Sequence, residues 1–314
     1  MIGRRGLVGM GLAVTPALAR AQTAWPDRQI RLIVGYPAGG PSDVFARLLA
    51  AQMAPRLGQP VVVENRPGGG AVLASEIAAR APADGHAWMH VDNGILVYNP
   101  ALYARLPYDP DRDFTGVGFI GRFPLYIVCR ADAPFGDFAA LVAASRRRAP
   151  TYGTPAVASP HHLAMELVKR RSGLAAEHVP YRGGQAAMQD LLGGSVDLVM
   201  IDTATGLPFI RDGRVSEART AEAAGVPTLR EMGHDAVAVG WQGISVPRGV
   251  PAPVVARLNA ELVRAVASEE VQSRMRALGI QTTGWSAAEF ETFVASENAR
   301  WRPLIRELGI RLDA

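Results

Sequence analysis

The stretch RLIVGYPAGGPSDVFAR, residues 31–47, joins an apolar strand to a helix and decides the fold that the rest of the chain must fit. Leu32-Ile33-Val34 is typical of a buried strand, and a helical pattern begins near Asp43. Between them lie Gly39 and Gly40, flanked by prolines. Such a loop is either only a tight turn, or it presents bare backbone N–H groups and a helix N-terminus to an anion.

The same strand–loop–helix order recurs outward from this stretch. Strands are predicted at 30–34, 61–63, 86–91, in two segments of 114–130 broken near Gly121, and at 178–180, 196–202 and 241–247. Helices are predicted at 43–57, 71–80, 137–148, 185–192, twice within 250–279, and at 286–309; residues 151–173 are predicted as a short strand, a loop and a helix. This alternation predicts an α/β protein with two domains, each a mostly parallel sheet flanked by helices. The expected domains are 22–121 plus 238–314, and 122–237.

The first 21 residues have the pattern of a signal peptide. Arg4-Arg5 precede a short apolar stretch, and small residues allow cleavage near Ala19 or Ala21. The paired arginines leave both general secretion and twin-arginine export open. We therefore expect an exported protein of the periplasm.

Composition narrows the function classes. The chain of 314 residues carries a formal charge of +4, which falls to +1 without the three arginines of residues 1–21. A near-neutral product gives no reason to expect a nucleic-acid partner. Cys129 is the single cysteine and is expected to be an inert core thiol, so no disulfide, metal site or cofactor is predicted.

Ligands of open α/β sheets bind outside the carboxyl ends of the strands, so the candidate site is sought there. A carboxylate held by two or three loop N–H groups needs no arginine, because charge-assisted bonds contribute roughly 1.5–3 kcal/mol each. Ser42 and Asp43 are alternatively plain N-caps. Asp92 and Asp202 would suit an ammonium group, or else cap a turn. His161 lies in a first helical turn, and Arg182 is either an anion contact or a solvated side chain.

Five segments together resemble the substrate-binding receptors of tripartite tricarboxylate transporters, the Bug family. They are WPDRQIRLIVGYPAGGPSDVFARLLA, LGQPVVVENRPGGG, NPALYARLPYDPDRDF, HVPYRGGQAAMQDLLGGSVDLVMID and APVVARLNAELVRAVASEEVQSRMRALG, in the family order. The resemblance runs from about Trp25 to the C-terminus. It implies a periplasmic binding protein of the Venus flytrap type, a monomer that binds a small carboxylate and delivers it to the membrane subunits of a transporter.

The resemblance also implies where the ligand binds. The family's loops fall on 36–43, 92–94, 154–161 and 181–185, and an aspartate of the family falls on Asp202. The candidate ligand-binding residues are Tyr36, Ala38, Gly39, Gly40, Ser42, Asp43, Asp92, Asn93, Thr154, Ala158, Ser159, His161, Tyr181, Arg182, Gly183 and Asp202.

Three features depart from the family. PAVASPHH, residues 155–162, places Pro160 and His161 at hydroxyl positions; Asp92 and Asn93 stand where serine or threonine is usual. Residues 211–229 lack an apolar run, which argues against the further strand that usually crosses back toward the first domain.

Two alternatives stay open: a ligand sensor for a membrane kinase, and a periplasmic enzyme that uses His161 with Asp92 or Asp202 as an acid–base pair.

Overall fold

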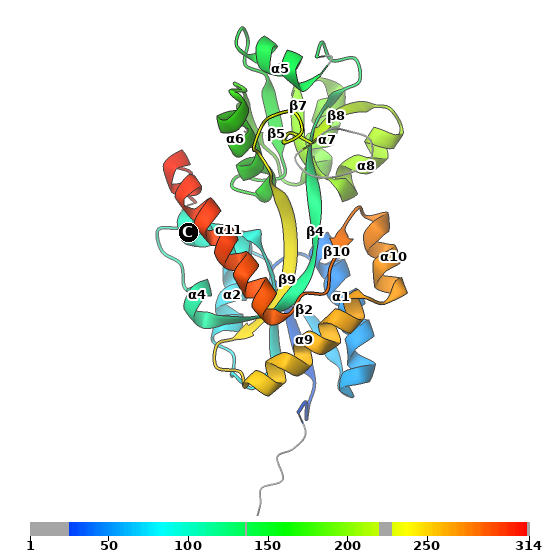
Figure 1. The fold of residues 1–314 in the computed structure, drawn as a ribbon, viewed down its shortest axis with the longest axis vertical. Helices are drawn as coiled ribbons and strands as arrows, with labels where there is room; N and C mark the ends of the chain where they lie inside the picture. Colours follow the sequence, from blue (N-terminus) through cyan, green and yellow to red (C-terminus); the bar gives the residue numbers. More distant parts are fainter. Residues whose placement is uncertain (1–24, 136, 220–227, 313–314) are drawn as a thin grey trace, which may run out of the picture.

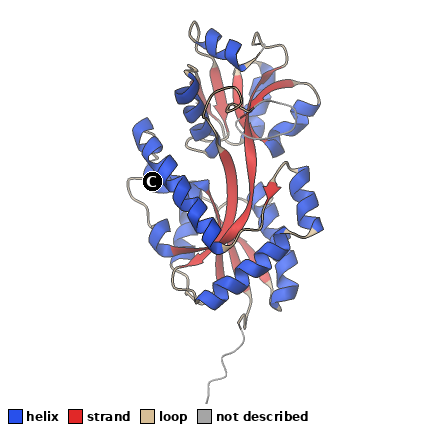
Figure 2. Cartoon of the chain, in the orientation of Figure 1, coloured by secondary structure: helices blue, strands red, loops and turns tan. Residues whose placement is uncertain are grey.

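The computed structural model describes residues 25–135, 137–219 and 228–312. The predicted signal peptide lies outside the described residues. Figure 1 shows two lobes, one above the other, with the long strands β4 (Phe114–Arg130) and β9 (Val239–Pro247) passing between them. Strands form the middle of each lobe and helices flank them (Figure 2).

The first lobe, the lower one in Figure 1, is built from both ends of the chain. Its strands lie in the order β2-β1-β3-β9-β4, and β1 is parallel to both β2 and β3, whereas β9 is antiparallel to β3 and β4. The elements with β4 and β9 are β1 (Ile30–Val34), α1 (Pro41–Leu57), β2 (Val61–Asn65), η1 (Gly69–Ala71), α2 (Val72–Ala79), β3 (Ala87–Asp92), η2 (Gly94–Tyr98, one π-helical turn), α3 (Asn99–Leu102), α4 (Pro110–Asp113), α9 (Ala252–Val266), α10 (Glu269–Ala277), β10 (Gln281–Thr282) and α11 (Ala287–Leu308).

The second lobe comes from one stretch in the middle of the chain. Its sheet continues from β4 in the order β7-β5-β6, and β8 also pairs with β4. The elements are α5 (Phe138–Ser145), β5 (Thr151–Thr154), α6 (Pro160–Ser172), β6 (Glu177–Pro180), α7 (Gly184–Gly193), β7 (Leu198–Asp202), α8 (Thr203–Arg211) and β8 (Val215–Arg219).

The core follows the alternation of side chains along the strands. Leu32 and Val34 face α1 and α9 and pack with Phe45 and Leu258, while Ile33 points to the opposite face. These side chains are at most 2% exposed. Burial at roughly 25 cal/mol per Å² of apolar surface is what stabilises the sheet and fixes the loops at its edge.

Three predictions about the crossing region are wrong. Residues 114–130 form one strand instead of two, because irregularities after Gly116 and after Phe119 bend β4 without ending it. A strand does follow Gly213, since β8 pairs antiparallel with β4, and residues 220–227 of that segment lie outside the description. Residues 203–211, for which no helix is predicted, form α8 despite Pro208.

β4 changes partner where it passes between the lobes. It pairs with β9 up to Pro124 and with β7 from Leu125 onward. Asp92 pairs with Gln242, Gln242 with Gly121, and Asp202 with Leu125. The loops after β3 and β7 therefore both begin beside residues 121–125 of β4. The domain boundaries at 121/122 and 237/238 stay a prediction.

Candidate functional site

The loop between β1 and α1 is shaped by its own aspartate. Gly39 has a φ of +80°, a conformation that favours glycine, and its N–H donates to Asp43 Oδ2 at 2.9 Å. Arg47 pairs with the same carboxylate, and these bonds hold the pKa of Asp43 at about 2. Asp43 is thus already bonded within the protein.

The N-terminus of α1 has no side-chain cap. Gly40 is the N-cap residue and cannot accept a hydrogen bond through a side chain, so the interpretation of Ser42 or Asp43 as the N-cap is wrong. Ala38 and Gly39 are exposed. The first-turn N–H groups of α1 and the positive end of its dipole are left for another acceptor.

A chain of hydrogen bonds that the sequence analysis missed orients Ser42. His90 Nε2 lies 3.0 Å from Gln242 Oε1, and Gln242 Nε2 donates to Ser42 Oγ at 3.4 Å. All three residues are buried. Burial lowers the pKa of His90, so a neutral ring donates through Nε2–H. Because Ser42 Oγ accepts from the amide, its own O–H is left to donate to a ligand. In the apolar segment WQGISVP, only Gln242 and Ser245 have polar aliphatic side chains. This pattern could have indicated Gln242 as a site residue, but only if the strand were known to cross between the lobes.

The carboxylate of Asp92, at the end of β3, is hydrogen-bonded to two groups of the first lobe. Its Oδ2 accepts from the Tyr36 hydroxyl and its Oδ1 accepts from the N–H of Ile95 at 3.0 Å. Burial and the Asp92 charge raise the pKa of Tyr36 well above its usual value, so the hydroxyl stays protonated and donates. The arrangement fits the interpretation of Asp92 as a cap, and both carboxylate oxygens have partners.

Asn93 connects the first lobe to the crossing strand. It is 1% exposed; its Oδ1 accepts from Trp241 N at 2.8 Å, and its Nδ2 lies 3.2 Å from both Val239 O and Tyr98 Oη. Its amide is therefore occupied by β9 and η2.

The loop after β5 is held mainly by its own side chains. Ser159 is the N-cap of α6, with its hydroxyl accepting from His162 N. His162 Nδ1 accepts from Ala158 N at 2.9 Å, which fixes Ala158 at a φ of +57°. Burial and the stacked ring of His178 lower the pKa of His162 to about 4, so the ring is neutral as this bond requires. Thr154 points inward, 2.7 Å from His178 Nε2.

His161 and Asp202 come together at the ends of α6 and β7. His161 Nε2 lies 3.3 Å from Asp202 Oδ2, and the two oxygens of Asp202 also accept from Thr205 N and Thr205 Oγ1. Burial alone would raise the pKa of Asp202, but the bonds from His161 and Thr205 outweigh it and hold the pKa below its usual value. His161 is 8% exposed, and its Nδ1 is buried without a hydrogen-bond partner among the described residues.

The turn after β6 forms its hydrogen bonds within the second lobe. The Tyr181 hydroxyl donates to Asp190 Oδ2 at 2.8 Å, and this bond with burial raises the pKa of Tyr181 to about 12. Gly183 has a φ of +112° and its N–H donates to Pro155 O. Arg182 is exposed and forms no ion pair with the described residues.

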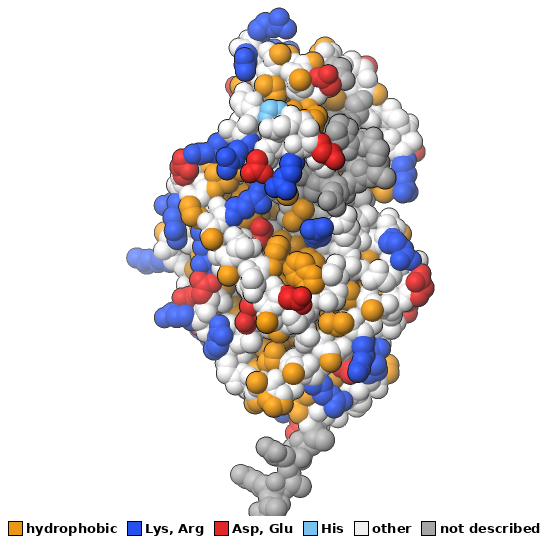
Figure 3. All heavy atoms as spheres, viewed as in Figure 1, with side chains coloured by type: hydrophobic (Ala, Val, Ile, Leu, Met, Phe, Trp, Pro, Cys, Tyr) orange, Lys and Arg blue, Asp and Glu red, His pale blue; other side chains and the backbone are white. Residues whose placement is uncertain are grey.

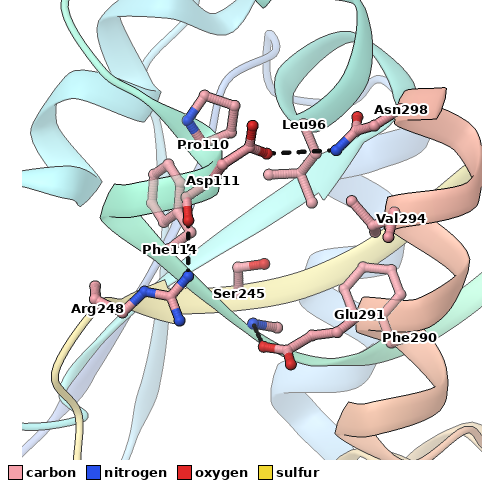
Figure 4. Close-up of a pocket in the computed structure, with 12 residues that line it drawn as sticks. Leu96, Pro110, Asp111, Phe114, Ser245, Arg248, Phe290, Glu291, Val294 and Asn298 are labelled. Atoms are coloured by element: carbon pink, nitrogen blue, oxygen red, sulfur yellow. Dashed lines mark hydrogen bonds between the residues drawn. The ribbon is translucent and has the colours of Figure 1, made fainter. Parts of the chain in front are cut away.

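Of the two acid–base pairs considered, one is in contact. His161 meets Asp202, whereas Asp92 is bonded to Tyr36 and Ile95. Ser42 in the first lobe and His161 in the second thus keep hydrogen-bonding capacity that the described residues do not use. A separate pocket on the first lobe (Figure 4) has none of the sixteen candidate residues in its lining.

Similar solved structures define the class. The R. palustris protein Rpa4515 with adipate superposes with a TM-score of 0.80 at 31% identity, covering 92% of this chain and all of that one. MatC from Rhodopseudomonas palustris with bound malate superposes with a TM-score of 0.77 at 30% identity, covering 90% of this chain and all of that one. The periplasmic binding protein BugD also has a TM-score of 0.77 at 30% identity, covering 92% of this chain and all of that one. The fold is that of the two-domain periplasmic binding proteins.

The family follows from the sequence. Residues 45–310 match the profile of the tripartite tricarboxylate transporter family receptors. BugT of Bordetella pertussis is 32% identical over 92% of this chain and 91% of its own. A Pseudomonas sp. (strain P51) protein encoded between tcbD and tcbE is 36% identical over 99% and 95%. The chain belongs to the tripartite tricarboxylate transporter receptor family, also represented by the Bug proteins. The described residues contain no helix long and apolar enough to span a bilayer.

Proposed function

We propose that this protein is an extracytoplasmic receptor that binds a small dicarboxylate between its two lobes and delivers it to the membrane subunits of a tripartite tricarboxylate transporter. The carrying observation is the pair of unused groups beside the crossing strands, the Ser42 hydroxyl and the buried His161 Nδ1. Relatives with bound adipate and malate support the carboxylate class.

In this proposal the first lobe binds one carboxylate. The Ser42 O–H and the uncapped N–H groups of α1 are its donors, and His90 and Gln242 hold Ser42 in place. Two or three such bonds, at roughly 1.5–3 kcal/mol each, are of the size that micromolar affinity requires, about 8 kcal/mol in total with the second lobe.

The second lobe then binds the other carboxylate through His161. With Nε2–H donating to Asp202, Nδ1 of a neutral ring is an acceptor and cannot bond a carboxylate. A carboxylate at Nδ1 therefore requires a ring protonated at both nitrogens, so that Nδ1–H donates to the ligand.

We further propose that residues 22–121 plus 238–314 and residues 122–237 close as two bodies about β4 and β9. Gly279 of the first lobe lies so near Thr203 of the second that an added Cβ would lie 1.9 Å from Thr203 Cγ2. This close approach sets the angle between the lobes at the crossing point.

The first experiment is a thermal-shift screen of the mature protein with malonate, succinate, malate, adipate and amino acids. A ligand at 100 times its Kd adds roughly 2.7 kcal/mol of stability. Isothermal titration in buffers of different ionisation enthalpy then measures proton uptake. No shift across the panel with folded protein contradicts the proposal.

Variants locate the site. Ser42→Ala and His161→Gln should each weaken binding by about tenfold or more, as expected for one charge-assisted bond. Ser296→Ala and His234→Gln, partly or fully exposed and outside the loops, are the matched controls.

Mass spectrometry of the recovered ligand separates receptor from enzyme: conversion of the ligand by the His161–Asp202 pair would overturn the receptor assignment. Ligand uptake in membranes that carry the transporter subunits tests delivery.

A further inference from the structure

A pocket of about 210 Å³ lies on the first lobe, away from the loops at the crossing point. It is bounded by η2, α4, the start of β4, the end of β9 and one face of α11 (Figure 4). At about 30 Å³ per water, the volume has room for roughly seven water molecules, or one small organic molecule.

Part of the wall is apolar. Leu96, Phe114 and Phe290 are each at most 5% exposed, and Val294 of α11 closes the same side. These side chains surround the space between β9 and α11 in Figure 4. A ligand that removes this surface from water gains roughly 25 cal/mol per Å², so it should have an apolar body.

Two buried polar atoms in the lining have no partner within the described residues. Ser245 is 1% exposed, and its hydroxyl points into the pocket without a hydrogen bond (Figure 4). Asn298 Oδ1 is also buried and unpaired, while Asn298 Nδ2 lies 3.4 Å from Asp111 Oδ1. Such atoms are rare in folded proteins unless a bound molecule satisfies them.

Two charged groups at the rim have no opposite charge as a partner among the described residues. Within this part of the chain, the Arg248 guanidinium donates only to the backbone oxygens of Asp111 and Arg112, at 2.9 and 3.3 Å. The Glu291 carboxylate there accepts only the N–H of Gly116, at 3.3 Å. The carboxylate of Asp111 does not serve Arg248, because Arg302 binds both its oxygens at 2.6 and 3.0 Å.

These groups divide by element. The donors are Ser245 of β9 and Arg248, which directly follows that strand, and α11 provides the acceptors, Glu291 and Asn298. Figure 4 shows Arg248 and Glu291 on opposite sides of Ser245. The ligand that complements this arrangement has an anionic end, a cationic end and an apolar body between or beside them.

We propose that this pocket is a second binding site, for a small aliphatic α-amino acid. Its carboxylate lies against Ser245 and Arg248, its ammonium group against Glu291 and Asn298, and its side chain against Leu96, Phe114 and Phe290. The site is separate from the one proposed between the lobes and does not depend on it.

The test is isothermal titration of the mature protein with L-leucine. 4-Methylpentanoate, which lacks the ammonium group, and 3-methylbutylamine, which lacks the carboxylate, should each bind at least about tenfold more weakly than leucine, one charge-assisted bond being lost. Ser245→Ala, Arg248→Gln and Glu291→Gln should each weaken leucine binding by about five- to tenfold, and exposed Arg257→Gln should not.

Ala295→Trp fills the pocket from an exposed position of α11 and should abolish leucine binding; Ala299→Trp on the same helix is the control. Both should leave carboxylate binding at the crossing point unchanged. Absence of leucine binding at concentrations of about 20 mM, far above a millimolar Kd, overturns the proposal. Leucine binding that survives Ala295→Trp but is lost in His161→Gln also overturns it, because it places leucine between the lobes.

Discussion

Asn93 offers the sharpest test of how the first lobe is joined to the crossing strand. Its side chain is the acceptor for Trp241 N–H and lies within 3.2 Å of Val239 O and Tyr98 Oη. Asn93→Ala removes the partners that Asn93 gives to the buried N–H of Trp241 and to the partly buried carbonyl of Val239. At about 1–3 kcal/mol for each unsatisfied group, we expect a loss of about 3 kcal/mol in the free energy of unfolding.

Asn93→Asp keeps the acceptor for Trp241 but places a carboxylate oxygen opposite Val239 O at a position 1% exposed. Burial raises the pKa of such a carboxyl. A raised folded-state pKa means that stability is lost as the pH rises, by about 1.4 kcal/mol per pH unit while only the unfolded form is ionised. The protonated acid can donate to Val239 O, so Asn93→Asp should approach wild type at low pH.

The assay is urea unfolding followed by tryptophan fluorescence at pH 5.5 and 7.5. The stability difference between wild type and Asn93→Asp should grow by roughly 2–3 kcal/mol between the two values, whereas that for Asn93→Ala should not change. Equal, pH-independent losses in both variants, or a loss under about 1 kcal/mol for Asn93→Ala, would refute the reasoning.

Three further predictions concern other contacts. Gly279 has a left-handed backbone conformation, and Gly279→Ala adds a methyl group that would clash with Thr203. The variant should separate the lobes, and an unchanged radius of gyration in small-angle X-ray scattering would count against this. Asp43→Asn removes a carboxylate whose pKa is lowered to about 2, so its stability deficit should vanish as the pH falls from 4 to 2; a deficit that persists in thermal melts at pH 2 contradicts this. Burial raises the pKa of Glu297, so ionisation costs stability as the pH rises, and Glu297→Gln should equal or exceed wild type in thermal melts at pH 8; a lower melting temperature there would contradict this.

Much of the fold follows from local pattern. The strand at Leu32-Ile33-Val34 and the helix after Gly39-Gly40 were predicted within a few residues of their observed bounds. The same holds for the long periodic segments near both ends of the chain. The errors came from residues whose local preference is overridden by packing. Gly121 suggested a break, yet it allows close approach of Gln281 to a continuous β4, as Gly116 and Gly118 do for Phe290 and Leu262.

The candidate site was predictable to the level of loops, not of side chains. Position after a strand predicted that Ser42, Asp92 and Asp202 lie at the carboxyl ends of β1, β3 and β7, and the structure has them there. Whether each side chain faces a ligand depends on partners far along the chain: Tyr36 occupies Asp92, and Trp241 occupies Asn93. Gln242 orients Ser42 from 200 residues away, a contact that no local spacing encodes.

The position of β9 has a consequence for the order in which the protein is made. β3 and β4 are not neighbours; β9 lies between them and is hydrogen-bonded to both. A chain emerging from its N-terminus therefore cannot close the sheet of the first lobe until Val239–Pro247 has been made, whereas the second half of β4 already has its partners β7 and β8. The middle of the chain should thus fold before the beginning does, leaving β3 and the first half of β4 with open edges that need protection from aggregation until β9 has been synthesised.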